Sequence, residues 1–322
     1  MAELRCWVLT EGHVGMVNQA IGLAEAMGLV PEVKRLAIRA PWKYLPPRLW
    51  LGPLRAPGPG GDRLEPPWPD LVISCGKRSV APALAIRRAS GGRTFAVHIQ
   101  RPPVAPSRFD LVIAPEHDGL TGENVFVTRA AVHRVTPARL AAAAARFAPA
   151  LAHLPRPLVA VLIGGSNGRH RLTPEVTARV ADQLAALSRN QNIGLAVTPS
   201  RRTGAENEAI LRDRLRGLKA VIWDGQGENP YFGYLGLADA VVVTADSVSM
   251  VSEACSTGKP VYVVDLPGAS RRIDRFHEML RQAGMTRRFE GRIEEWHYAP
   301  PDDTARAAAE VWRRLRARQP AA

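Results

Sequence analysis

Residues 158–168 read LVAVLIGGSNG, an uninterrupted apolar run that leads into three glycines and a serine. A short apolar run bounded by glycine is typical of a strand that is buried on both faces of a sheet. The next segment, 174–187, has helical spacing and begins with proline, which suits the first turn of a helix. A buried strand, a glycine loop and a helix in this order predict a βαβ unit with a parallel sheet.

The same alternation extends over both halves of the chain. The expected strands are 4–9, 30–38, 70–74, 94–99, 111–114, 125–128, 158–163, 193–198, 220–223, 239–244 and 260–265. The expected helices are 15–28, 79–89, 137–151, 174–187, 204–215, 230–237, 247–256, 271–282 and 304–318. We therefore predict an α/β protein with two Rossmann-like domains that face each other across a cleft, and a terminal helix that could cross back to the first domain.

A proline-rich break at Leu154-Pro-Arg-Pro157 is the expected domain boundary, and a chain of 322 residues is long enough for two domains. The predicted first domain is 1–154, with an irregular insertion at 40–69 that is rich in proline and glycine. The predicted second domain is 155–300, and 301–322 is the terminal helix.

The chain is basic, with 43 Lys and Arg against 30 Asp and Glu and a formal net charge of +13. Such a field attracts phosphorylated ligands or anionic membranes, and no nucleic-acid-binding motif accompanies it. No apolar run reaches the ~20 residues of a membrane helix, and residues 1–5 do not resemble a signal peptide. We expect no nucleic-acid partner and a cytoplasmic protein, with peripheral attachment to the inner membrane left open.

The three cysteines lie in apolar surroundings and form no C-x-x-C motif, so we expect them to be small buried hydrophobic residues. The chain also lacks D-x-D, G-x-S-x-G and the Lys-Ser/Thr of a P-loop. We therefore expect neither a bound metal nor a cofactor, and no ATP hydrolysis.

Ligands of open α/β sheets bind at the carboxyl ends of the strands, so the loops there are the candidate sites. In the second half, the glycine loop at 164–168 is a candidate phosphate site, and Arg201 with Arg202 could clamp a diphosphate. Asp246 is the expected cap of the next helix, and Glu253 could accept both hydroxyls of a ribose. The predicted nucleotide- and phosphate-binding residues are Gly164, Gly165, Ser166, Arg201, Asp246, Ser247, Ser249 and Glu253.

In the first half, residues 10–19 form a glycine loop that does not match G-x-G-x-x-G, which disfavours a nicotinamide cofactor. Gln100, His117 and Asp118 also follow strands, and a neighbouring His–Asp pair can serve as a general base for a hydroxyl group. The candidate catalytic residues are His117, Asp118 and His13.

Ordered motifs across the chain resemble the bacterial branch of the mitochondrial fission "elongated mitochondria" family. They are Gly12-x-x-Gly15-Met16-x-Asn18-Gln19, Cys75-Gly76-Lys77-Arg78, His98-Ile99-Gln100, Pro115-Glu116-His117-Asp118, Gly164-Gly165-Ser166 and Thr244-Ala-Asp246-Ser247-Val-Ser249-Met250-Val-Ser252-Glu253. This family is similar to two-domain glycosyltransferases of the B type.

The resemblance implies that the second domain holds a nucleotide sugar and the first domain holds an acceptor. It implies ribose binding by Glu253 and phosphate binding by Gly165, Ser166 and Ser249. His13 stands where a related peptidoglycan glycosyltransferase also carries a histidine. The acceptor-side residues implied are Gly12, Gly15, Asn18, Gln19, Gly76, Lys77 and Gln100.

The leading hypothesis is a metal-independent glycosyltransferase that uses a nucleotide-sugar donor and an acceptor hydroxyl, which could be lipid-linked. One alternative is a nucleotide-sugar epimerase on the same fold. The other is a non-catalytic scaffold on an anionic membrane, because the segment 39–55 has four basic and no acidic residues beside Trp42, Tyr44 and Trp50.

Overall fold

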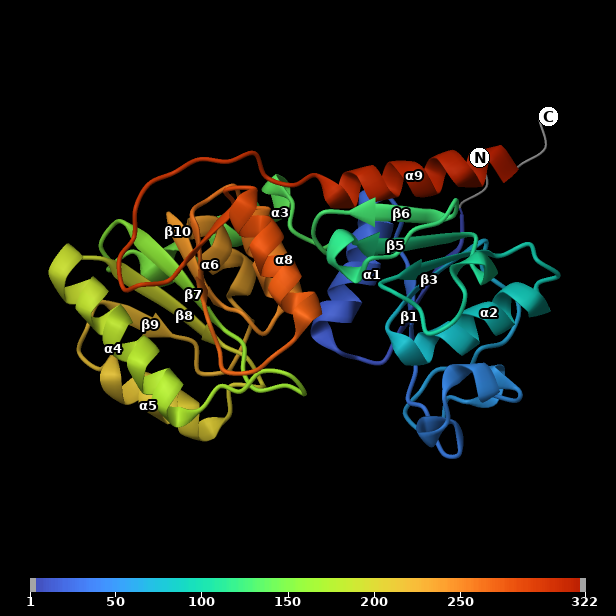
Figure 1. The fold of residues 1–322 in the computed structure, drawn as a ribbon, viewed down its shortest axis with the longest axis horizontal. Helices are drawn as coiled ribbons and strands as arrows, with labels where there is room; N and C mark the ends of the chain where they lie inside the picture. Colours follow the sequence, from blue (N-terminus) through green and yellow to red (C-terminus); the bar gives the residue numbers. More distant parts are fainter. Residues whose placement is uncertain (1–3, 319–322) are drawn as a thin grey trace. The chain divides into compact units, whose positions relative to one another are not determined.

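The computed structural model describes residues 4–318, so residues 1–3 and 319–322 of the predicted domain ranges lie outside the described part. The chain divides into two compact units, each built on a parallel six-stranded sheet with flanking helices (Figure 1). The first unit contains the residues up to Arg134 together with those from Asp302 onward, and the second is Val135–Pro301. This is the predicted α/β fold class.

The sheet of the first unit has the order β2-β1-β3-β4-β5-β6. Its strands are β1 (Cys6–Thr10), β2 (Glu32–Arg35), β3 (Leu71–Cys75), β4 (Phe95–Ile99), β5 (Leu111–Pro115) and β6 (Val125–Thr128). Its α-helices are α1 (Val14–Ala26), α2 (Val80–Ala89) and α9 (Asp303–Arg318). Short 3-10 helices occur at η1 (Trp42–Tyr44), η2 (Pro47–Leu49), η3 (Pro53–Arg55), η4 (Lys77–Ser79), η5 (Pro106–Arg108) and η6 (Glu116–Asp118).

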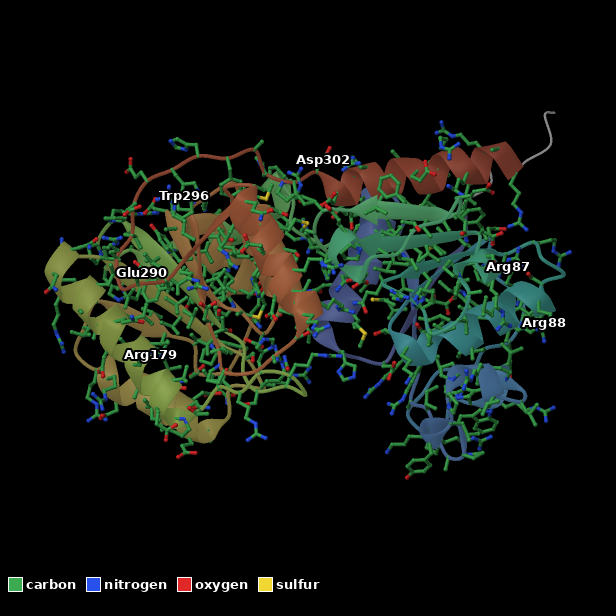
Figure 2. The ribbon with its side chains drawn as sticks, viewed as in Figure 1. Arg87, Arg88, Arg179, Glu290, Trp296 and Asp302 are labelled. Atoms are coloured by element: carbon green, nitrogen blue, oxygen red, sulfur yellow. The ribbon has the colours of Figure 1, made fainter. Side chains whose placement is uncertain are left out.

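Helices cover both faces of this sheet, which is why its central strands are apolar along their whole length. Leu23 of α1 and Val311 of α9 pack in one buried cluster with Val8 of β1. Ile86 of α2 packs in another cluster with Val72 of β3. Arg87, in the last turn of α2 (Figure 2), donates two hydrogen bonds of 2.9 and 3.0 Å to the carboxylate of Asp110 at the start of β5.

The terminal helix α9 is tied to the first unit by Asp303. Its buried carboxylate accepts backbone hydrogen bonds from Arg129 at 3.1 Å and Ala130 at 2.8 Å, just after β6. Helix α9 also contacts α1. The last helix therefore returns to the unit in which the chain began, as the predicted fold class allowed.

The second unit has the sheet order β12-β11-β10-β7-β8-β9. Its strands are β7 (Leu158–Ile163), β8 (Gly194–Pro199), β9 (Ala220–Ile222), β10 (Ala240–Thr244), β11 (Val261–Val264) and β12 (Thr286–Arg288). Its helices are α3 (Pro137–Leu151), α4 (Pro174–Gln191), α5 (Ala205–Arg214), α6 (Tyr231–Leu237), α7 (Val248–Cys255) and α8 (Arg271–Gln282).

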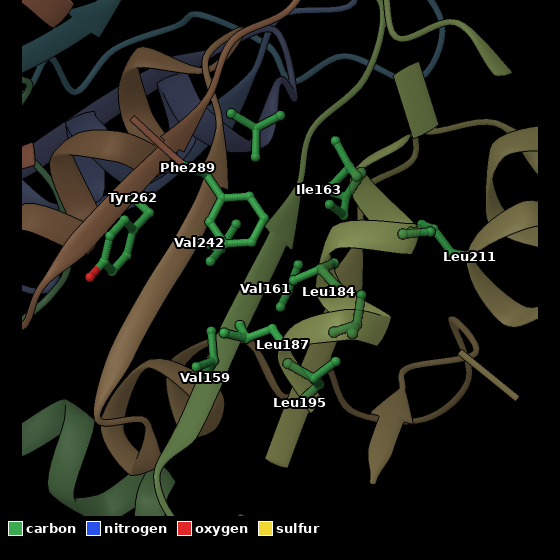
Figure 3. Packing of buried hydrophobic residues seen from close by; sticks show 14 of the residues in the cluster. Val159, Val161, Ile163, Leu184, Leu187, Leu195, Leu211, Val242, Tyr262 and Phe289 are labelled. Carbon is green, nitrogen blue, oxygen red and sulfur yellow. The ribbon is translucent and has the colours of Figure 1, made fainter. Parts of the chain in front are cut away.

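One face of this sheet packs against α4 in a continuous apolar core (Figure 3). Val159 and Val161 of β7 lie beside Leu184 of α4, and Phe289 extends the same cluster. Every residue of β7 is buried. The six-residue apolar run of the sequence is therefore one of the two central strands of the second sheet.

Helix α3 belongs to the second unit, whereas the proline break had suggested that it ends the first. The reason is its close packing on α6: a Cβ at Gly233 would lie 2.5 Å from the Phe147 ring, and one at Gly236 would lie 2.6 Å from the Leu140 carbonyl oxygen. Two glycines thus let the helices approach closely, and this contact moves the division of the chain to Arg134–Val135.

Within residues 4–318, no helix combines the length and the apolar character that a membrane crossing requires. All three cysteines are buried and free, as expected.

Candidate functional site

The sheet of the second unit has a topological switch point between β7 and β10. From β7 the chain winds through β8 and β9 toward one edge, and from β10 it winds through β11 and β12 toward the other. In such a sheet, the loops after the two central strands separate in opposite directions and leave a crevice for a ligand. The predicted glycine loop follows β7, and Asp246 follows β10, so both flank this point.

Asp246 organises the strand ends around its buried carboxylate. One oxygen, Oδ1, accepts a 2.6 Å hydrogen bond from the Thr244 hydroxyl. The other, Oδ2, accepts the Gly165 amide at 3.2 Å and lies 2.6 Å from Nη1 of Arg202. A buried carboxylate must be compensated by hydrogen bonds or a cation, and here it has both. Asp246 thereby joins the loops after β7, β8 and β10.

Asp246 was predicted to cap the following helix, and this prediction is wrong. The residue that caps α7 is Ser247, whose Oγ accepts a hydrogen bond from the Met250 amide at 3.3 Å. Aspartate and serine are both good caps, so two adjacent candidates cannot be separated by residue type alone. The contacts to Arg202 and Gly165 direct the Asp246 side chain away from the helix.

Gly164 and Gly165 permit the close approach of these loops. A Cβ at Gly164 would lie 2.3 Å from Oδ1 of Asp246, and one at Gly165 would lie 2.0 Å from the carbonyl oxygen of Arg202. Gly165 also has a φ of +155°. Their amides donate to Thr244 Oγ1 and Asp246 Oδ2, so both N–H groups are paired inside the protein. A phosphate would have to be bound by neighbouring groups.

Hydroxyl groups after β8 complete this network. Ser200 and Thr203 donate hydrogen bonds of 2.5 and 2.7 Å to the carbonyl oxygen of Gly164. The sequence places both residues in a strand-end loop, but their partner across the sheet is visible only in the structure. Ser166 Oγ accepts the Leu172 amide at 3.0 Å, which folds the glycine loop back on itself.

Arg201, the predicted diphosphate cation, is exposed at the end of β8. Within residues 4–318 its guanidinium has no ion-pair partner, in contrast to the neighbouring Arg202. Arg201 is therefore available to an anionic ligand, while Arg202 already neutralises Asp246.

Helix α7 carries Ser249 in its first turn and the buried Glu253 further along. Tyr231, at the start of α6, donates a 2.5 Å hydrogen bond to Oε2 of Glu253. Burial and the Glu253 carboxylate raise the pKa of the Tyr231 hydroxyl well above its ordinary value, so the phenol keeps its proton and donates it. Tyr231 was not predicted, because a tyrosine at a helix start carries no sequence signal for this contact.

Two further buried histidines adjoin the glycine loop and Ala245. His277 of α8 lies with Nε2 2.8 Å from the carbonyl oxygen of Ala245, the residue before Asp246. Burial lowers the pKa of His277, so the neutral ring donates from Nε2. His170 lies in the loop after β7, and its backbone pairs with Gly268. Neither histidine was predicted as a site residue.

The first unit has its own switch point, between β1 and β3. Glu11 follows β1, and its carboxylate accepts hydrogen bonds from the Arg78 amide at 3.1 Å and the Arg78 guanidinium at 3.2 Å. Gly76 has a φ of +93°, and a Cβ there would lie 2.4 Å from Sδ of Met16. Gly12 and Lys77 are exposed in these loops, and Gly15 lies in the first turn of α1.

The predicted acceptor-side glutamines meet each other. Gln100 Nε2 donates to Gln19 Oε1 at 3.3 Å, and the Cys75 thiol lies 3.9 Å from the same oxygen. Gln100 has a φ of +79°, which is rare for a residue with a side chain. Asn18 is half-buried beside Gln19 on α1. The structure thus brings Gln19 and Gln100 together at the carboxyl ends of the strands.

His117 and Asp118 form a buried pair in η6. Nε2 of His117 lies 3.6 Å from Oδ1 of Asp118, and each side chain is 1% exposed. The Arg101 amide donates to Asp118 Oδ2 at 3.2 Å. A general base must reach its substrate within hydrogen-bonding distance, so the pair would have to become exposed in order to act. His13, by contrast, is exposed at the start of α1.

No cluster of three or more His, Cys, Asp or Glu side chains that could hold a metal ion occurs within the part of the chain that the structure describes.

The fold is shared with solved nucleotide-sugar enzymes. The UDP-GlcNAc 2-epimerase of Methanocaldococcus jannaschii aligns with a TM-score of 0.58 and 12% identity, over 98% of this chain and 99% of that one. The UDP-GlcNAc 2-epimerase of Neisseria meningitidis, solved with UDP-GlcNAc bound, aligns with a TM-score of 0.54 and 14% identity, over 97% and 99%. At this identity, the likeness concerns the fold alone.

Sequence comparison identifies a family. A protein of Arabidopsis thaliana named mitochondrial fission protein ELM1 is 38% identical over 277 residues, which cover 78% of this chain. The chain spans 65% of the length of that protein. The family model described as Mitochondrial fission ELM1 matches residues 14–315. The predicted resemblance is confirmed, and the chain belongs to the mitochondrial fission ELM1 family.

Proposed function

We propose that the second unit binds a nucleotide sugar and that the protein is a metal-independent glycosyltransferase, which transfers the sugar to an acceptor hydroxyl. The observation that carries this proposal is the Asp246 network at the β7–β10 switch point. Three loops are held together there by a buried carboxylate, Arg202 and Gly165. Fixed loops at a switch point are the usual setting for a nucleotide in an open α/β sheet.

In this proposal the donor is bound by groups around the network rather than by Asp246 itself. Glu253 is assigned to the ribose hydroxyls, with Tyr231 fixing the orientation of its carboxylate. Because its side chain is buried, Glu253 too would have to become exposed in order to reach them. Arg201 and the amino end of α7, at Ser247 and Ser249, bind the diphosphate. The same positive groups stabilise the negative charge that develops on the departing diphosphate.

The glycine loop has an indirect role in the proposal. Gly164 and Gly165 set the position of Ser166, since their own amides are occupied by Thr244 and Asp246. Ser166 is therefore the member of the loop that we assign to the phosphates.

The first unit supplies the groups for the acceptor in the same proposal. Gln19 and Gln100 bind an acceptor hydroxyl through their paired amides. His13 is the candidate base, because it is exposed at the start of α1 and an imidazole nitrogen can accept the proton of a hydroxyl group. His117 and Asp118 are assigned as a second candidate pair that would act only after exposure.

A nucleotide-sugar epimerase is the second candidate function. The specific observation in its favour is that two structures with the same fold are UDP-GlcNAc 2-epimerases, one of them with UDP-GlcNAc bound. An epimerase converts the sugar without an acceptor, whereas a transferase releases the nucleotide only as the sugar moves to an acceptor or to water.

The test is calorimetric titration of the full chain with UDP-GlcNAc, followed by GDP and CMP sugars. We expect one of these nucleotides to bind. Arg201→Met should lower its affinity by about tenfold or more, because a charge-assisted hydrogen bond is lost. Glu253→Gln should weaken the binding of the nucleotide sugar and the binding of a free nucleoside diphosphate to the same extent. Arg179→Met is the control, because this exposed arginine lies on α4 (Figure 2) and has no part in the proposed site.

A nuclear magnetic resonance time course with the bound sugar then separates the two enzymes. Appearance of an epimeric sugar without acceptor would identify an epimerase and displace the transferase proposal. Failure to bind any of the nucleotides, or equal binding by wild type and Arg201→Met, would refute the proposed donor site.

A further inference from the structure

The Pro/Gly-rich insertion presents a concentrated apolar surface. Of the eight large hydrophobic side chains that are exposed within residues 4–318, four lie between positions 44 and 51. Their exposed fractions are 79% for Tyr44, 39% for Leu45, 56% for Leu49 and 86% for Leu51. Single exposed hydrophobic residues are ordinary, but four of the eight within eight consecutive positions are an unusual concentration. We call these four residues the exposed patch.

Basic residues and no acidic ones accompany the exposed patch in the sequence. Residues 38–61 contain Arg39, Lys43, Arg48 and Arg55 and no aspartate or glutamate. Lys43 and Arg48 are exposed within the short helices that carry Tyr44 and Leu49. The partner must therefore combine an apolar layer with negative charge, as the headgroup boundary of an anionic membrane does.

The two tryptophans expected to contact a membrane instead hold the segment together. Trp42 donates its indole N–H to the carbonyl oxygen of Leu51 at 2.8 Å, and Trp50 donates to that of Leu45 at 3.0 Å. Trp50 is buried in a small cluster with Ala56 and Ala81 of α2. Because the indoles close the loops from inside, the leucines at 45 and 51 are held outward.

The backbone of the segment also suits contact with lipid. Six prolines lie between positions 41 and 59, and each removes a backbone N–H that would otherwise need a partner away from water. Three 3-10 helices, η1 to η3, pair further amides within the segment. The segment rests on α2, which η2 and η3 contact (Figure 1). Few backbone polar groups would therefore lack a hydrogen-bond partner when the surface of the segment is buried.

We propose that the exposed patch and its flanking basic residues dock the first unit on an anionic lipid surface. Tyr44, Leu49 and Leu51 enter the headgroup boundary, while Lys43 and Arg48 bind lipid phosphates. The surface is distinct from the nucleotide site proposed above, and neither proposal depends on the other.

Vesicle flotation of the full chain tests the docking surface. We expect binding to vesicles of equal parts phosphatidylcholine and phosphatidylglycerol at low salt, and loss of binding in pure phosphatidylcholine or at high salt. The double variant K43E/R48E should weaken binding at least about tenfold, because each basic residue near such a surface contributes roughly fivefold. The double variant L49D/L51D should also weaken binding, because it replaces apolar side chains at the lipid contact by acidic ones.

Matched controls separate the patch from general effects. Val30→Asp changes an aliphatic residue that is 96% exposed outside the segment, and Arg179→Glu reverses an exposed charge on α4. Both should bind vesicles as the wild type does. All of the substituted side chains are exposed or partly exposed, so thermal unfolding should be unchanged and a lost interaction cannot be attributed to misfolding.

Three results would overturn the proposal. The first is no binding of the wild type to anionic vesicles at low salt, and the second is unaltered binding by L49D/L51D. The third is a concentration-dependent dimer in sedimentation that L49D/L51D abolishes, which would assign the patch to a second copy of the chain.

Discussion

Nη1 of Arg202 lies 2.6 Å from Oδ2 of Asp246, whose side chain has no exposed surface. The same carboxylate oxygen accepts the Gly165 amide, so one buried charge links the loops after β7, β8 and β10. A charge this deeply buried stabilises the loops only while its partners remain in place.

Removal of the Asp246 carboxylate should therefore lower the free energy of unfolding. Asp246→Ala leaves Arg202, the Gly165 amide and the Thr244 hydroxyl without their acceptor, and we expect a loss of about 3 kcal/mol in the free energy of unfolding. Urea denaturation measures it. Asp182→Ala is the control, because Asp182 pairs with Arg214 on the surface and its loss should cost less than about 1 kcal/mol. Equal losses for the two variants would contradict the structural role of Asp246.

The glycine loop permits a comparison of two positions three residues apart. Gly165→Ala places a Cβ 2.0 Å from the Arg202 carbonyl oxygen, at a φ of +155°, and should lower the stability by more than about 2 kcal/mol. Gly168→Ala meets nothing within 4 Å and should change it by less than about 0.5 kcal/mol. Thermal or urea unfolding of the two variants tests the difference, and a neutral Gly165→Ala would show that the loops do not need this close approach.

The hydrogen bond between Tyr231 and Glu253 should also be measurable. Tyr231→Phe leaves Glu253 Oε2 buried without that donor, and we expect a loss of about 1–3 kcal/mol by urea unfolding. Tyr44→Phe is the control. Tyr44 is 79% exposed, so the loss of its hydroxyl should leave the stability unchanged. If both variants behaved alike, the buried pair would not contribute to the fold.

His98 should make the first unit sensitive to acid. The imidazole is buried on β4, with Nδ1 2.9 Å from Ser74 Oγ, and burial lowers its pKa from 6.5 to about 3. Between these two values the unfolded chain binds the extra proton, so stability falls as the pH falls from 6.5 toward 3, by at most about 1.4 kcal/mol per pH unit.

His98→Asn keeps a polar group near Ser74 but cannot titrate, so its unfolding free energy should depend less steeply on pH over that window. The measurement is urea unfolding of both proteins at several pH values between 4 and 7. Parallel curves for wild type and variant would show that His98 does not carry the acid sensitivity.

Asp303 fixes the terminal helix to the first unit. Asp303→Ala removes the acceptor of the Arg129 and Ala130 amides and leaves these two donors without it. The free energy of unfolding should fall by about 2–4 kcal/mol. Asp302→Ala changes the adjacent exposed carboxylate and should have little effect. Hydrogen exchange of α9 is the measurement, and unchanged protection in Asp303→Ala would contradict the anchoring role.

Most elements of the fold can be predicted from the sequence. A buried parallel strand appears as a short apolar run, and a helix appears as apolar residues at helical spacing. The runs at 70–74 and 158–163 correspond closely to β3 and β7. Strand β12 could not be predicted, since Thr286–Arg288 has two exposed arginines in three residues and pairs only because the edge of β11 is available.

The candidate site was predictable as a set of strand-end loops but not as a network. The sequence indicates that Gly164, Arg201 and Asp246 follow strands of one sheet. It does not reveal that Arg202 rather than Arg201 pairs with Asp246, or that Tyr231 binds Glu253. Those choices depend on side-chain directions across neighbouring loops.

The sequence by itself predicted the fold class and the loops at the strand ends, because burial and periodicity are properties of each segment alone, and its motifs carried the resemblance to the family. Only the tertiary structure decided that α3 joins the second unit, that the amides of Gly164 and Gly165 are paired internally, and that leucines rather than tryptophans form the exposed patch. These outcomes depend on contacts between segments far apart in the chain, and no local pattern records which of two similar residues makes such a contact.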